Sequence, residues 1–234
     1  LSSAASDVYK RQIVDARIPQ SSRNPDVDEL TAGKPRMVVL NRVDQADPEG
    51  TKRWAEHFRA KGYAVLESDA KSGVGTAKFA GAVRELLADK LRAYAEKGMT
   101  GRVVRVMILG IPNVGKSTFI NKVAGRKTAK TEDRPGVTRS KQWVPIDRNL
   151  ELLDTPGILW PKFEDQQVGL NLALIGSMND EILNIEEMAV SLIQYLKDVY
   201  PLLLTKRYDL SDEAEESCKN EQDAYEVLAQ IARN

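Results

Sequence analysis

The sequence has little cysteine and histidine and no excess charge. Among its 234 residues are one cysteine, Cys218, and one histidine, His57. One cysteine excludes an internal disulfide framework, and the two residues together cannot build a tetrahedral zinc site. Lysine plus arginine equals aspartate plus glutamate, at 34 each, so a nucleic-acid partner would have to be held by a local basic patch. No apolar run reaches membrane-spanning length and no signal-peptide pattern is present, so we expect a cytoplasmic protein without a membrane partner.

Both ends of the sequence look unusual. Residues 1–12 show no hydrophobic periodicity and are similar to a translated sequencing-adapter tract, so we set them aside as non-native. The last residues, VLAQIARN, stop within a helical pattern that has no cap. We therefore expect the sequence to be a fragment of a longer one.

Strand and helix patterns alternate over residues 13–165. The expected strands are 36–44, 63–73, 102–110 and 149–157, and the expected helices are 51–62, 79–94 and 117–125. Such alternation predicts an α/β domain with a mostly parallel sheet and helices on both faces. Strand signals fade afterwards, and residues 166–234 are expected to form a small, incomplete, all-helical C-terminal domain.

The stretch GIPNVGKST, residues 110–118, predicts a phosphate-binding loop. It matches G-x-x-x-x-G-K-[ST] and stands between a predicted strand and a predicted helix, as that loop requires. Lys116 would pair with the β- and γ-phosphates, and the Ser117 hydroxyl would bind Mg²⁺. A chance glycine turn is the alternative, and the flanking elements disfavour it. The candidate nucleotide ligands here are Pro112, Asn113, Val114, Gly115, Lys116, Ser117 and Thr118.

Two further segments suit a magnesium site and a sensor of the γ-phosphate. DTPG, residues 154–157, ends a predicted strand, so Asp154 can hold Mg²⁺ through water and the Gly157 amide can contact the γ-phosphate. Thr138, in a polar stretch between the two motifs, could complete the magnesium shell, although it could also be an ordinary loop threonine. The predicted catalytic residues are Lys116, Thr138 and Gly157.

The candidate base-reading residues precede the phosphate loop in the chain. A carboxylate can accept both N–H donors that distinguish guanine from adenine. The usual N-K-x-D motif is missing downstream of DTPG, but NRVD stands upstream at 41–44, and SDAKSG follows at 68–73. The order predicts a GTPase domain whose back half has moved to the front of the chain, which a parallel sheet tolerates. The base-site candidates are Asn41, Arg42, Asp44, Asp69, Ala70 and Lys71.

These motifs, in this order, resemble the circularly permuted GTPases, and most closely the bacterial ribosome biogenesis GTPase A family. DARIP at 15–19, PGVTR at 135–139 and YPLLLTKRY at 200–208 add to the resemblance. It implies GTP hydrolysis coupled to assembly of the large ribosomal subunit, with Mg²⁺ as cofactor, GTP or GDP as ligand, and ribosomal RNA and proteins as partners. We expect a monomer with slow intrinsic turnover that the ribosome stimulates.

The chain departs from the family pattern at several positions. Arg42 stands where lysine is usual, and Asp69 where serine is usual, so that turn should be held differently. The family's N-terminal histidine segment and basic C-terminal tail are missing from the sequence, and His57 is expected to be a surface or packing residue.

Catalysis must use a group other than the residue after DTPG. That residue is Ile158, which cannot orient a water molecule as glutamine does in many GTPases. Asn113 could hold K⁺ beside the phosphates, or it could merely shape the loop. Two alternatives to a GTP hydrolase stay open. One is a module that binds GTP or GDP without turnover, and the other is an ATP-using enzyme.

Overall fold

The computed structural model describes residues 8–30, 33–99, 101–126, 142–160, 165–179, 183–210 and 221–233. The chain divides into two compact units, residues 1–172 and 173–234. The sequence analysis places a domain boundary between residues 165 and 166, whereas the division after residue 172 falls within the helix α6 (Gln166–Leu174). Among the described residues, no helix has the length and apolar character needed to cross a membrane.

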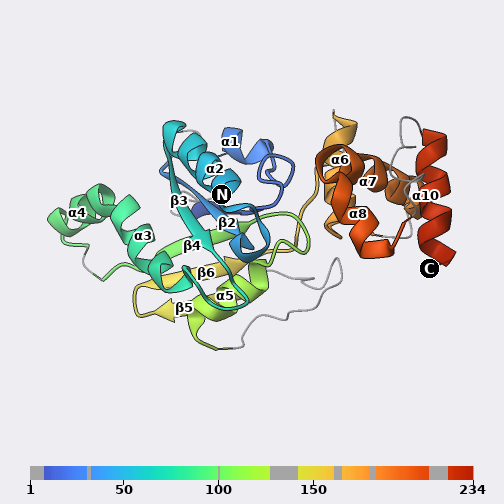
Figure 1. Cartoon of the computed structure of the whole chain (residues 1–234). Helices are drawn as coiled ribbons and strands as arrows, with labels where there is room; N and C mark the ends of the chain where they lie inside the picture. The colour runs from blue at the N-terminus through green and yellow to red at the C-terminus, as the bar shows by residue number, and fades with distance from the viewer. Residues whose placement is uncertain are drawn as a thin grey trace. The chain divides into compact units, whose positions relative to one another are not determined.

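A six-stranded sheet forms the centre of the first unit (Figure 1). Its strands are β1 (Val8–Asp15), β2 (Arg36–Asn41), β3 (Tyr63–Ser68), β4 (Val104–Leu109), β5 (Gln142–Asp147) and β6 (Leu150–Asp154), in the order β3-β2-β1-β4-β6-β5. All neighbouring strands are parallel except β5, which pairs antiparallel to β6 at the edge. The observed sheet is the mostly parallel one that the sequence predicts.

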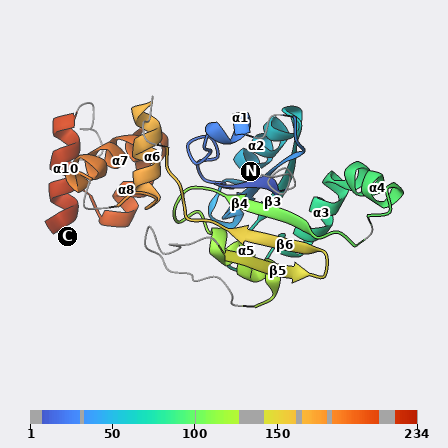
Figure 2. The same ribbon diagram turned by 180° about the vertical axis from the view of Figure 1, so that it is seen from behind.

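Helices connect the strands, and a helical unit follows the sheet. The helices are α1 (Asp26–Leu30), α2 (Pro48–Ala60), α3 (Phe79–Leu86), α4 (Ala88–Glu96), α5 (Lys116–Ala124), α6 (Gln166–Leu174), α7 (Ile185–Val199), α8 (Pro201–Tyr208) and α10 (Glu221–Arg233), with short 3₁₀ turns η2 (Val43–Gln45) and η3 (Thr76–Lys78). Both views show α2 on one side of the sheet and α3 and α5 on the other (Figures 1 and 2).

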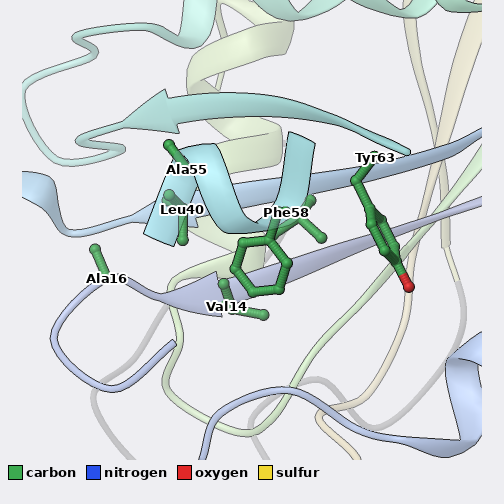
Figure 3. Packing of buried hydrophobic residues seen from close by; sticks show 7 residues of the cluster. Val14, Ala16, Leu40, Ala55, Phe58 and Tyr63 are labelled. Carbon is green, nitrogen blue, oxygen red and sulfur yellow. The ribbon is translucent and has the colours of Figure 1, made fainter. Parts of the chain in front are cut away.

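One half of the core lies between α2 and the first strands (Figure 3). Val38 and Leu40 of β2 pack against Phe58 of α2 in this cluster. Side chains alternate along a strand, so Val39, which is also fully buried, belongs to the opposite face. The run of consecutive apolar residues in β2 is therefore the pattern of a strand covered on both faces.

Local signals in the sequence fix the ends of α2. Pro48 occupies the first turn, where its missing N–H costs nothing, and the Asp47 side chain accepts a hydrogen bond from the amide of Gly50. The chain leaves the helix through Gly62, whose φ is 79°. His57 is exposed on this helix with its ring edge against Trp54, as a surface residue would be.

The predicted helix over 79–94 is two helices, α3 and α4, separated at Leu87. Leu87 has φ −106° and ψ 8°, outside the helical region, and its side chain is buried. None of the residues of α4 is buried, so no core contact holds α4 in line with α3. Apolar spacing predicted one helix because it does not report where the packing against the sheet stops.

Residues 8–12, which the sequence analysis set aside, lie in the central strand. Gln12 pairs with Val38 of β2 and with Leu109 of β4. This differs from the expectation that residues 1–12 have no place in the fold, while a foreign origin of the tract stays a prediction. Arg11 in this strand is fully buried, and burial lowers its pKa to about 10.

The second unit has its own core. Val190 and Ile193 of α7, Leu204 of α8 and Val227 of α10 form one buried cluster. Asn184 caps α7 by accepting a hydrogen bond from the Glu187 amide at 3.3 Å, an interaction that stabilises a helix start. Cys218 lies outside the described residues.

Candidate functional site

The strand order places a ligand site at the carboxyl ends of β1 and β4. The strands that follow β1 in the chain, β2 and β3, lie on one side of it, whereas β5 and β6, which follow β4 in the chain, lie on the other side, so the direction reverses between β1 and β4. In open α/β sheets, ligands bind at such a reversal, beyond the carboxyl ends of the strands. The motifs predicted at 41–44, 68–73, 110–118 and 154–157 begin at the last residues of β2, β3 and β6 or directly after β4.

The phosphate loop joins β4 to α5 and depends on close backbone approaches. Asn113 and Gly115 both have positive φ, 57° and 93°. A side chain at Gly110 would place its Cβ 2.6 Å from the carbonyl oxygen of Ile13. A Cβ at Gly115 would lie 2.5 Å from Nδ2, the side-chain amide nitrogen of Asn41. Both glycines are therefore required by neighbouring strands as well as by the loop itself.

Lys116 begins α5 and is buried beneath the loop. Its side chain is 6% exposed, and Nζ donates a hydrogen bond to the carbonyl oxygen of Ile111 at 2.7 Å. Burial lowers the pKa of this ammonium to about 8, and the nearby carboxylate of Asp154 opposes the shift. A cation held in this way at a helix N-terminus faces the place where the loop amides would receive an anion.

Ser117 and Asp154 form the candidate magnesium site. The Ser117 hydroxyl donates to Oδ2 of Asp154 at 2.9 Å. Oδ1 of Asp154 is buried and has no hydrogen-bond partner among the described residues, and burial is the main cause that raises the pKa of this carboxyl. An unsatisfied buried carboxylate oxygen beside a hydroxyl suits a hard divalent cation, so the residues present fit Mg²⁺. Thr138, predicted as a third ligand, lies outside the described residues.

The side chain of Asn41 joins three of the predicted motifs. Its Nδ2 donates to the carbonyl oxygen of Val114 in the phosphate loop at 2.8 Å, and its Oδ1 accepts from the Ala70 amide at 3.0 Å. Asn41 is buried at the end of β2. The hydrogen bond between Asn41 and Val114 joins residues that are 73 positions apart. Direct contacts therefore hold the base-reading segments against the phosphate loop.

Arg42 adds a second link to the phosphate loop. Its Nη2 donates to the carbonyl oxygen of Asn113 at 2.7 Å, and its backbone is left-handed with φ 64°. Asp44 follows within η2 and has an exposed side chain. Only Val43 separates Asp44 from Arg42, which contacts the phosphate loop directly.

Asp69 holds the second base-reading turn through its own side chain. Its carboxylate accepts hydrogen bonds from the amides of Lys71 at 2.8 Å and Ser72 at 3.1 Å. Hydrogen bonding with Ser72 is the main cause that lowers the pKa of Asp69. The aspartate thus caps the turn as an ionised acceptor. Lys71 is exposed, and Lys122 of α5 donates to the Ser72 carbonyl oxygen at 3.3 Å.

Gly157 lies directly against the phosphate loop. A Cβ at this position would be 2.6 Å from the Cα and N atoms of Pro112. The next amide, of Ile158, donates to the carbonyl oxygen of Gly110 at 3.2 Å, while the Ile158 side chain is 53% exposed. Thr118 stands in the first turn of α5 and is half-buried. Of the predicted site residues outside the phosphate loop, Asn41, Arg42 and Gly157 lie against it, Ala70 bonds to Asn41, and Asp154 bonds to Ser117 at the end of the loop.

Sequence reasoning assigned no role in the site to Asp15 and Arg17, which lie beside Arg42. Asp15 is fully buried at the end of β1, and Arg17 pairs with it at 2.8 Å. The signal that could have identified them in the sequence was a charged residue, Asp15, at the end of a buried strand. The carboxyl ends of neighbouring parallel strands meet at one edge of the sheet, where ligands bind.

Comparisons with known proteins found relatives in sequence and in fold. A family described as "50S ribosome-binding GTPase" matches residues 105–229. Ribosome biogenesis GTPase A of Priestia megaterium is 50% identical over 202 residues, which cover 86% of this chain and 70% of that protein. The Bacillus cereus protein of the same name is 49% identical over 201 residues, covering 86% and 68%. A GDP-bound structure of YlqF is 26% identical with a TM-score of 0.57, and covers 97% of this chain and 90% of that one.

Proposed function

The chain belongs to the ribosome biogenesis GTPase A family, and from that membership we propose that it acts as a GTP-driven switch in assembly of the large ribosomal subunit. It is a GTP-binding and GTP-hydrolysing protein of ribosome assembly with a circularly permuted GTPase fold, as the sequence predicted. A GTPase of this kind requires Mg²⁺. The large subunit as the particle, the individual site residues and K⁺ are the parts that we propose.

The base-reading assignment depends on one observation, the two hydrogen bonds of Asn41 that join the Ala70 amide to the Val114 carbonyl. We assign Asp44 to the N1–H and N2–H₂ donors of guanine and the Ala70 amide to its O6. Arg42 covers one face of the base with its aliphatic stem, and Asp69 and Lys71 frame the turn that presents Ala70.

We assign the phosphates to the loop. Pro112 opens the loop, the backbone N–H groups from Asn113 to Thr118 line the anion site, and Lys116 supplies a fixed positive charge to the β- and γ-phosphates. The amide of Gly157 contacts the γ-phosphate, and its contact with Pro112 would carry the presence of that phosphate into the segment after β6.

Ser117 and Asp154 would hold the magnesium ion, Ser117 directly and Asp154 through water, with Thr138 as a further ligand. Bound Mg²⁺ supplies charge that compensates the β- and γ-phosphate oxygens. Within this arrangement, Lys116 and the loop amides orient the γ-phosphate for attack by water, and Ile158 cannot orient that water.

Asn113 is the residue that we assign to K⁺. Its left-handed backbone turns the loop beside the phosphates, where a monovalent cation would neutralise charge that develops during hydrolysis. Replacing Na⁺ with K⁺ at constant ionic strength should raise the rate of GTP hydrolysis at least about tenfold. Equal rates in the two salts would remove K⁺ from the account. Asn113→Ala should abolish the difference between the salts.

The large ribosomal subunit is the proposed partner, and we propose that the chain acts as a monomer. Purified chain mixed with GTP in single-turnover amounts should hydrolyse it slowly, and added large subunits should accelerate the reaction, whereas small subunits should not. A chain that binds GTP and GDP but shows no turnover with large subunits would instead be a nucleotide-binding module without catalysis.

A further inference from the structure

The DARIP segment contains a carboxylate for which the proposed function has no use. Asp15 ends the central strand β1 and has no exposed surface. Its oxygens accept from the Arg17 amide at 3.0 Å, from Arg17 Nε at 2.9 Å and from Arg17 Nη2 at 2.8 Å. A carboxylate at a buried strand end costs several kcal/mol in desolvation unless such partners offset it.

A second arginine approaches the same carboxylate from the residue directly after the neighbouring strand β2. Nε of Arg42 lies 3.8 Å from Oδ2 of Asp15, and Nη2 of Arg42 donates to the carbonyl oxygen of Asn113 at 2.7 Å. One guanidinium therefore faces the end of β1 on one side and the phosphate loop on the other. The planar fork of arginine can do both at once, whereas the point charge of a lysine can satisfy one partner at a time.

We propose that Asp15 is a positioning residue of the nucleotide site: its buried carboxylate holds the guanidinium of Arg42 so that Arg42 fixes the phosphate loop at Asn113. The inference rests on the proposed function, because it assigns Asp15 a role in binding the same nucleotide. It gives Asp15 of the DARIP segment a role in the nucleotide site, and it explains how arginine can replace the usual lysine at position 42.

The surroundings of Arg17 support this arrangement. Hydrogen bonding to Asp15 is the main cause that raises the pKa of Arg17, and the carboxylate of Asp44 contributes in the same direction. Arg17 thus lies in the field of both the buried carboxylate and the base-reading carboxylate. Arg17 already neutralises the negative charge of Asp15. Burial of that charge therefore does not require Arg42, whose approach to Asp15 is an additional interaction.

A double-mutant cycle on nucleotide affinity tests the proposal. Asp15→Asn keeps the shape of the side chain and removes its charge, and Arg42→Met removes the guanidinium. With a fluorescent GDP analogue, each single change in the full chain should raise Kd about tenfold, the size expected for losing a hydrogen bond to a charged group. The double variant should also bind about tenfold more weakly than the wild type, because both changes remove one linkage.

Asp28→Asn is the matched control. Asp28 is also an aspartate bonded to an arginine, Arg23, and to Tyr63, but it lies near the amino ends of β2 and β3. Its loss should lower stability in urea unfolding while Kd stays within about twofold of wild type. A merely structural role for Asp15 would give Asp15→Asn the same behaviour as this control, and that result would overturn the proposal.

Three further results complete the test. Independent effects that multiply to about a hundredfold in the double variant would also overturn the proposal. If Asp15→Asn does not fold, Arg42 carries the test, since its side chain is 30% exposed. Arg42→Lys should then recover only part of the affinity that Arg42→Met loses, and wild-type binding by Arg42→Met would refute the linkage. Failure of the proposed function is distinguishable, because the wild-type chain itself would then bind no guanine nucleotide.

Discussion

Among the described residues, four buried side chains keep polar atoms that have no hydrogen-bond partner, and the positions of two of them, Asp154 and Arg11, give these two opposite consequences. Oδ1 belongs to the Asp154 carboxylate whose other oxygen, Oδ2, accepts from the Ser117 hydroxyl, and the proposed Mg²⁺ would use Oδ1 through water. Nε and Nη2 of Arg11 lie in the core, far along β1 from the strand end that carries the site. An unsatisfied buried donor costs about 1–3 kcal/mol, and more when it is charged. The proposed Mg²⁺ accounts for the unpaired oxygen of Asp154, whereas the two unpaired donors of Arg11 lower the stability of the fold.

Replacing Arg11 with leucine should therefore stabilise the chain. Arg11→Leu removes the two unpaired donors and a buried charge, at the loss of the hydrogen bonds from Nη1 to the carbonyl oxygens of Lys10 and Pro35. We expect a net gain of about 1–3 kcal/mol, measured as a higher midpoint in urea unfolding. A lower midpoint would show that Arg11 is satisfied in solution. Arg105→Leu on β4, which changes an exposed arginine, is the control and should shift the midpoint little.

Tyr63 should make stability depend on alkaline pH. Its phenol donates to Asp28 and accepts from Arg23 at 2.7 Å, and burial is the main cause that raises its pKa above 10.0. Because the folded state favours the protonated phenol, this stabilisation is fully present below pH 10 and is lost as pH rises through and above that value. Tyr63→Phe should cost about 1–2 kcal/mol at pH 7, and the difference from wild type should shrink above pH 10. A difference that stays constant up to pH 11 would contradict this reading.

At the scale of elements, α5 is held both to α3, the helix after the base-reading turn, and to the turn itself. Phe119 of α5 and Phe79 of α3 are both fully buried and meet edge to face with ring centroids 5.2 Å apart. Lys122, one turn further along α5, bonds to the turn at Ser72. The turn that presents Ala70 and the helix that carries Lys116 are therefore connected through packing on the face opposite α2.

This connection predicts an interaction energy between the two rings. Phe79→Leu and Phe119→Leu should each destabilise the fold, and the double variant should fall short of the sum by about 0.5–1.5 kcal/mol, the value for an aromatic pair. Phe58 belongs to the cluster on the other face, so Phe58→Leu combined with Phe119→Leu is the control and should be additive. Urea unfolding of the six chains measures this, and an additive Phe79 and Phe119 pair would contradict it.

Sequence predicted most elements but not their interruptions or their surroundings. The run Met37–Leu40 and the glycine stop at Gly62 are local signals, and β2 and the end of α2 follow from them. The break at Leu87 depends on where packing against the sheet stops, which apolar spacing does not encode. The strand character of residues 8–12 was missed because Lys10, Arg11 and Gln12 do not have the apolar pattern of a central strand.

At the scale of the whole molecule, the sequence predicted which motifs belong together but not how they are joined. The permuted order could be predicted because NRVD and SDAKSG precede the phosphate loop in the chain. The carboxyl ends of parallel strands lie at one edge of the sheet whatever the order of the strands in the chain. The contacts that join the motifs, through Asn41, Arg42 and Asp15, need coordinates, because each links residues at least 27 positions apart. Lys122 and Arg126, both exposed, bond to the carbonyl oxygens of Ser72 and Pro145, contacts that also need coordinates.

The central claim is that Asp44 and the loop around Lys116 hold opposite ends of one guanine nucleotide, and Asp44→Asn tests it most directly. Asparagine cannot accept both guanine donors, but its amide N–H can donate to the 2-oxo group of xanthine. In the full chain, we predict that Kd for GDP rises at least about tenfold and that XDP becomes the preferred ligand. Asp47→Asn, an exposed aspartate three positions on, should leave both Kd values within about twofold. Unchanged preference for GDP in Asp44→Asn would contradict the account.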